Sequence, residues 1–88
     1  MNPIDRSEAA GVVREAIERV APDVDAAALA PDADIRVEAD LDSMDFLAVV
    51  ESVFDRTGIA VPERDYGAVR TIDDFATYLV RTSGGTPE

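Results

Sequence analysis

The chain lacks several residue types that many functions require. It has no cysteine, no histidine, no tryptophan and no lysine. Without cysteine there are no disulfides and no thiolate chemistry, and without histidine the commonest general base and metal ligand is missing. Most nucleophilic catalysis is thereby excluded, so we do not expect an enzyme.

Long apolar stretches are also missing. No run approaches the roughly 18 apolar residues that indicate a membrane span, and residues 1–14 lack the basic start and apolar block of a signal peptide. We therefore expect a cytoplasmic protein that does not enter a membrane.

Negative charge is abundant. Nineteen Asp and Glu residues face eight basic ones, which gives a formal net charge of -11 over 88 residues. Such a surface repels nucleic acid and anionic lipid and attracts basic protein surfaces. The eight arginines are scattered singly, so there is no polybasic stretch. The expected partner is a cationic protein. The length and the 47% hydrophobic content suit a single small domain, expected to be monomeric.

The first half of the chain predicts one helix and a long connection. Apolar residues recur at three- and four-residue steps over residues 7–20, and Pro22 ends that helix. Residues 23–41 then form a long loop, and a loop of that length usually has a function. The apolar side chains expected to anchor this loop are Leu29, Ile35 and Val37.

A second helix is predicted from Ser43 to Thr57, closed by Gly58 in the left-handed conformation. At about 100° per residue, its side chains divide into two faces. The predicted core face holds Phe46, Leu47, Val50, Val53 and Phe54. The predicted solvent face holds Met44, Asp45, Ala48, Glu51, Ser52 and Asp55.

The remaining sequence predicts a short helix within residues 63–69, with Tyr66 and Val69 facing inward, and a last main helix that starts at Thr71. Residues 82–88 have little to bury and are predicted to be a disordered tail after a domain spanning residues 1–81. The expected fold is all-α: a small bundle of three main helices plus one short helix, with a long loop between the first two.

Ser43 is the main candidate site, because a hydroxyl at a helix start lies near unpaired N–H groups and the positive end of the helix dipole, where a phosphate is favoured. The simpler interpretation is a capping serine. Asp42 could supply the cap instead, which would leave the hydroxyl free, and Met44 would then be exposed beside it. An exposed methionine next to a modifiable hydroxyl suggests a surface that partners bind.

The acidic residues of the second helix admit two further interpretations. Glu51 and Asp55 are like charges four apart, which destabilises a helix and therefore favours partner recognition over a structural role. Asp40, Asp42 and Glu51 match three positions of a calcium loop, but its required glycine is absent. We predict no specific metal site.

The segment Asp42-Ser43-Met44-Asp45-Phe46-Leu47, with Gly58-Ile59-Ala60-Val61-Pro62 and the Thr71-Ile72 helix start, resembles an acyl carrier protein over about residues 4–80. By that resemblance Ser43 carries 4'-phosphopantetheine, transferred from coenzyme A by a phosphopantetheinyl transferase using magnesium. The family presents acidic residues of this helix to basic partner enzymes and buries the acyl chain between its helices. The recognition candidates implied are Asp42, Met44, Asp45, Glu51 and Asp55.

The resemblance implies a non-enzymatic carrier that holds acyl intermediates as thioesters on the Ser43 arm for fatty acid, polyketide or related specialised biosynthesis. Its partners would be acyl-transferring, condensing or acyl-ligating enzymes. The family usually has Asp-Leu-Gly before the Asp-Ser pair, where this chain has Glu38-Ala39-Asp40-Leu41, so a different loop path is expected. The alternative is an unmodified acidic adaptor of the same fold that acts through second-helix contacts alone.

Overall fold

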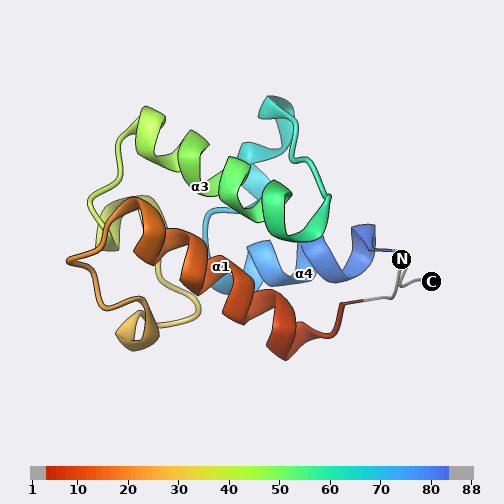
Figure 1. Cartoon of the computed structure of the whole chain (residues 1–88), viewed down its shortest axis with the longest axis horizontal. Helices are drawn as coiled ribbons and strands as arrows, with labels where there is room; N and C mark the ends of the chain where they lie inside the picture. Colours follow the sequence, from red (N-terminus) through yellow and green to blue (C-terminus); the bar gives the residue numbers. More distant parts are fainter. Residues whose placement is uncertain (1–3, 84–88) are drawn as a thin grey trace.

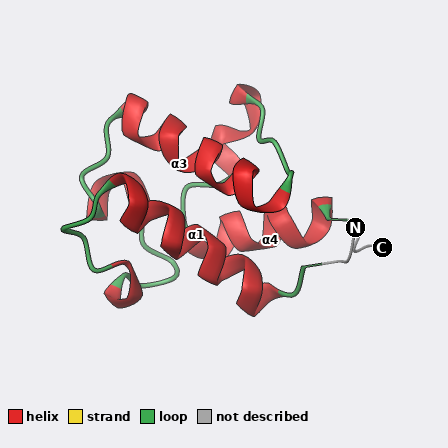
Figure 2. Cartoon of the chain, viewed as in Figure 1, coloured by secondary structure: helices red, strands yellow, loops and turns green. Residues whose placement is uncertain are grey.

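Each of the three long helices begins after a residue whose side chain accepts a backbone N–H from the first turn. In the computed structural model, which describes residues 4–83, these are Asp5, Asp42 and Thr71. The helices they start are α1 (Arg6–Val20), α3 (Ser43–Thr57) and α4 (Ile72–Thr82). Three short elements complete the order: η1 (Ala26–Ala28), α2 (Ile35–Glu38) and η2 (Glu63–Ala68). The all-α prediction is confirmed, and Figure 2 shows helices and loops with no strand across the described residues.

The helix α1 is the centre of the bundle, because it packs against both α3 and α4. Figure 1 shows α1 crossing in front, with α3 running alongside it and α4 behind. The largest side chains buried between the helices are Phe46, Phe75, Ile17, Ile35, Ile72 and Leu79. Apolar burial of this kind stabilises the domain at about 25 cal/mol per Å² of apolar surface.

The predicted boundaries of the second main helix are confirmed. It spans Ser43–Thr57, and Gly58 closes it with a φ of 74°, in the left-handed region that glycine adopts without steric cost. The short helix is also confirmed as η2, with Val69 buried at its end and Tyr66 partly buried.

The predicted core face of α3 is wrong at two positions. Leu47 is 39% exposed and Phe54 is 47% exposed, whereas the unassigned Val49 is fully buried. The buried residues of α3 are Phe46, Val49, Val50 and Val53, so the buried side of the helix is centred between Val49 and Val50 and is rotated away from Leu47 and Phe54.

The long connection contains two short helices that the sequence patterns did not reveal, η1 and α2. Ile35 is buried and Leu29 is partly buried against the core, as predicted, but Val37 is 69% exposed and does not anchor the loop. Ile35 and Val37 are two residues apart on α2 and so project from nearly opposite sides of the helix, which means that only one of them can face the core, and it is Ile35.

Backbone contacts fix the connection to the start of α4. The N–H of Ile35 donates to the carbonyl of Arg70 at 2.9 Å, and the N–H of Asp73 donates to the carbonyl of Pro31 at 2.9 Å. The long connection is therefore held in place by these hydrogen bonds to the start of α4 as well as by its buried apolar side chains.

The last helix extends beyond the predicted domain boundary at residue 81. Thr82 is the last residue of α4, and Ser83 is buried, with its Oγ accepting the N–H of Ile4 at 3.1 Å. The rest of the predicted tail, residues 84–88, lies outside the described residues.

Candidate functional site

Ser43 is the first residue of α3, and its side chain is exposed. The cap is supplied by Asp42, whose Oδ1 accepts the N–H of Asp45 at 2.8 Å. This confirms that Asp42 caps the helix, so the Ser43 hydroxyl is not used to satisfy the helix end. The result is a hydroxyl that a partner can reach, at the positive end of a 15-residue helix.

Arg36, on α2, contacts this hydroxyl. Its Nη2 donates to Ser43 Oγ at 3.3 Å, and its guanidinium carbon lies 5.5 Å from the centre of the Phe46 ring, in cation–π range. Arg36 could not be recognised as a site residue from the sequence, because Arg36 and Ser43 belong to separate helices and no helical spacing connects them. Only the turn between α2 and α3 brings them together.

That turn depends on Asp40, which has a φ of 54°, in the left-handed region. The N–H of Leu41 then donates to the carbonyl of Arg36 at 2.8 Å, which closes the chain back on α2. The sequence lacks the family's usual glycine in this segment, and Asp40 adopts a backbone conformation that glycine adopts more easily.

Several apolar side chains of α3 are exposed in the turns that follow Ser43. Met44 is 74% exposed, as predicted for the solvent side, and Leu47 and Phe54 are also exposed, although they were predicted to face the core. At about 100° per residue, Ser43, Leu47 and Phe54 project within about 60° of one another, so they share one side of α3.

A shallow, mainly apolar groove of about 250 Å³ lies on this side of α3. Its lining residues are Leu47, Val50, Glu51, Phe54, Ala60, Val61 and Tyr66. Tyr66 comes from η2 and packs edge-on against Phe46, with ring centres 5.4 Å apart. The groove therefore lies between α3 and the segment that follows it, and begins about one helical turn after Ser43.

The predicted recognition residues all lie on α3 or at its start. Asp42, Met44, Glu51 and Asp55 are exposed, and Asp45 is half-buried. Glu51 also lines the apolar groove, so acidic and apolar character meet there. Within residues 4–83, no three acidic side chains are grouped closely enough to hold a metal ion.

Asp34, which caps the start of α2, links the long connection to Arg70, just before α4. Its carboxylate accepts the Nε–H of Arg70 at 3.0 Å and the N–H of Arg36 at 2.9 Å. Desolvation of the carboxyl raises its pKa, but the hydrogen bonds from Arg70 and from the backbone of Arg36 and Val37 outweigh that effect, and the pKa of Asp34 is lowered. The ionised carboxylate thus holds α2, and with it Arg36, in place.

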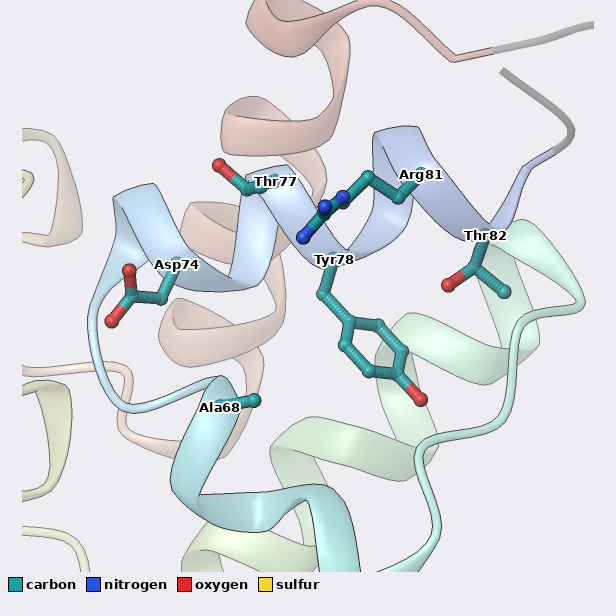
Figure 3. Close-up of a pocket in the computed structure, with 6 residues that line it drawn as sticks. All are labelled: Ala68, Asp74, Thr77, Tyr78, Arg81 and Thr82. Atoms are coloured by element: carbon teal, nitrogen blue, oxygen red, sulfur yellow. The ribbon is translucent and has the colours of Figure 1, made fainter. Parts of the chain in front are cut away.

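A second hollow lies between η2 and α4, away from Ser43. Figure 3 shows Ala68 on η2 and its other lining residues on α4, among them Tyr78 and Arg81. The Tyr78 hydroxyl donates to Asp65 Oδ2 at 2.9 Å, and burial together with this hydrogen bond raises the pKa of Tyr78. Because the Tyr78 hydroxyl is engaged in holding η2 against α4, we assign this hollow a structural role.

No helix among the described residues has the length and apolar character needed to cross a membrane.

The family of the chain follows from comparison with known proteins. The profile of the phosphopantetheine attachment site family matches residues 11–79, so the chain belongs to this family. It is a carrier with covalently attached 4'-phosphopantetheine and not a catalyst. As such it is a partner of a phosphopantetheinyl transferase and of acyl-handling enzymes.

Similar proteins of known name are acyl carrier proteins of mycobacteria. The chain is 23% identical over 86 residues to the meromycolate extension acyl carrier protein of Mycobacterium tuberculosis strain H37Rv, which covers 98% of this chain and 74% of that protein. It is 24% identical over 85 residues to the protein of the same name from Mycobacterium leprae, covering 97% of this chain and 73% of that protein. No solved structure gives a significant match.

Proposed function

We propose that Ser43 is the attachment residue and that the chain works as a monomeric cytoplasmic carrier that holds acyl intermediates as thioesters. The observation that carries this proposal is the Ser43 hydroxyl, exposed at the start of α3 while Asp42 supplies the helix cap. A chain without any thiol can hold an acyl thioester only on an added group.

The site suits a phosphodiester chemically. In the loading step, Ser43 Oγ attacks the phosphorus next to the pantetheine end of coenzyme A. A new P–O bond forms, the bond within the pyrophosphate breaks, and adenosine 3',5'-bisphosphate leaves with its electron pair. The serine proton passes to a base in the active site of the transferase. The positive end of α3 favours the anionic product.

The groove along α3 supports an acyl cargo. Leu47 and Phe54 expose apolar surface on the same side of the helix as Ser43. When an acyl chain covers that surface, apolar area of both the chain and the protein is removed from water, which favours a docked acyl chain over one exposed to solvent. We propose that the cargo lies against this groove when no partner enzyme holds it.

The acidic residues at the start of α3 and along it form the surface that partner enzymes recognise. Asp42, Asp45, Glu51 and Asp55 present negative charge along the same helix that carries the hydroxyl, with Met44 between them. Complementary basic surfaces would be steered to Ser43 and held in register by these charges.

The relatives' name supports a pathway of acyl-chain extension. Fatty acid, polyketide and specialised lipid synthesis all include such steps, so we propose this class of pathway for the chain, with condensing, acyl-transferring or acyl-ligating enzymes as its partners.

The test is loading in vitro. Purified apo-protein is incubated with coenzyme A, magnesium and a broad-specificity phosphopantetheinyl transferase, and its intact mass is measured. We expect one arm-sized mass increase, its complete loss in Ser43→Ala, and its retention in the matched control Ser7→Ala, which changes an exposed serine in the first turn of α1. Gain of the arm by Ser43→Ala would refute the assignment, and no gain by the wild type would favour the adaptor alternative.

A further inference from the structure

We propose that Arg36 is a positioning residue for the phosphodiester formed on Ser43, a role that rests on the attachment proposed above. Its guanidinium binds the non-bridging phosphate oxygens and stacks on Phe46, and so fixes the first atoms of the arm against the start of α3.

Arg36 is close to the atom that would carry the phosphate. Arg36 Nη2 already lies 3.3 Å from Ser43 Oγ, the atom that becomes the ester oxygen. The phosphorus is bonded directly to that oxygen, so the two non-bridging oxygens fall within the reach of a side-chain rotation. A guanidinium presents parallel N–H groups that match two oxygens of one phosphate.

The Arg36 side chain is preorganised by its contact with Phe46. The guanidinium lies 5.5 Å from the centre of the Phe46 ring, and Phe46 is itself fixed in the core and packed against Tyr66. A cation held on an aromatic ring loses less side-chain freedom when it binds an anion, because much of the ordering has already occurred.

The charge of Arg36 is also available to a phosphate. Within residues 4–83, Arg6, Arg56 and Arg70 form ion pairs with carboxylates, whereas Arg36 belongs to the arginines that form none, and it is the one that contacts Ser43 Oγ. Loading adds a negative charge between Asp42 and Asp45, in a chain whose net charge is already -11. A cation without a carboxylate partner at that point offsets the repulsion.

The test is a double-mutant cycle between the arm and Arg36. Wild type, Arg36→Gln and Arg36→Lys are each prepared in apo and loaded forms, with the mass of each confirmed, and unfolded in urea at low salt. Arg81→Gln is the matched control, because it makes the same change near the end of α4, at the opposite end of the molecule from the start of α3 (Figure 1). The ³¹P resonance of each loaded form is recorded in parallel.

We expect loading to lower the unfolding equilibrium constant about two- to five-fold more in the wild type than in Arg36→Gln, the range of an exposed ion pair. This difference should shrink at 1 M salt, and Arg36→Lys should retain part of it. The ³¹P resonance should shift in Arg36→Gln and not in Arg81→Gln.

An equal effect of loading in wild type and Arg36→Gln, with an unchanged ³¹P resonance, would overturn the role of Arg36 while leaving the attachment at Ser43 intact. Failure of the wild type to gain the arm, or attachment at another residue, would overturn both proposals and would be seen first, in the mass spectra.

Discussion

The first turn of α3 and the side of the helix below it differ in how their side chains are engaged. At the first turn, Asp42 caps the helix and Arg36 contacts the Ser43 hydroxyl, so both of these side chains have a partner. Further along, Leu47 and Phe54 expose apolar surface over a groove, and nothing in the described chain covers them. The helix thus separates the proposed attachment residue, which is held in place, from an open apolar surface, and this suits a carrier whose cargo must be held and then released.

Two phenylalanines on α3 give the largest test of this difference. Phe46 is 2% exposed and Phe54 is 47% exposed. We expect Phe46→Ala to lower the free energy of unfolding by about 3–5 kcal/mol, because it leaves a cavity in the core, and Phe54→Ala to lower it by about 1 kcal/mol or less. Urea unfolding of the apo-protein measures both. Similar losses would mean that Phe54 is packed and that the groove is not open.

A second comparison separates the cap from the neighbouring hydroxyl. Asp42→Ala should cost about 1 kcal/mol of stability, because the N–H of Asp45 loses its acceptor. Ser43→Ala should change stability by less than about 0.5 kcal/mol, since the hydroxyl does not cap the helix. Thermal unfolding of the two variants provides the measurement, and Asp42→Asn, which can still cap, is the control. A larger loss for Ser43→Ala would show that the serine is structural.

The parts of the fold that could be predicted from the sequence are those that local spacing determines. The limits of α3 follow from the residues around Ser43 and from Gly58, and the start of α4 follows from Thr71. The exposure of Leu47 and Phe54 could not be predicted, because helical periodicity identifies an apolar arc but not which part of it the neighbouring helices cover.

The same limit explains the site. That Asp42 and Ser43 lie at a helix start can be read from consecutive residues. The contact between Arg36 and Ser43 depends on the turn at Asp40. It also depends on the ion pair of Asp34 with Arg70, which joins the start of α2 to the segment before α4, far away in the sequence. A pattern within one helix contains no information about such contacts.

Asp34 provides a smaller test, based on pH. Its pKa is lowered below the ordinary value of 3.8 in the folded protein, so its stabilising contribution is fully present above that value and is lost as the pH falls through the folded pKa. Asp34→Asn should cost about 0.5–1 kcal/mol at pH 7, the range of an exposed ion pair, and nothing below the folded pKa. Unfolding free energies of wild type and variant between about pH 7 and pH 2.5 should therefore converge on acidification. A constant difference would argue against an ionic role.

The smallest effect is expected for Asp40→Gly, in the turn that brings Arg36 to Ser43. A non-glycine residue in the left-handed region costs about 1–2 kcal/mol, less for aspartate, and glycine recovers this at an entropic cost of about 0.5–1 kcal/mol in the unfolded chain. With its φ of 54°, Asp40→Gly should therefore raise stability by about 0.5 kcal/mol or leave it unchanged. Asp40→Val should lower stability by more than 1 kcal/mol, because a β-branched side chain is strained there. Asp40→Asn, which keeps the size but not the charge, separates strain from electrostatics. If valine were tolerated as well as glycine, the left-handed turn would not be what brings α2 to the start of α3.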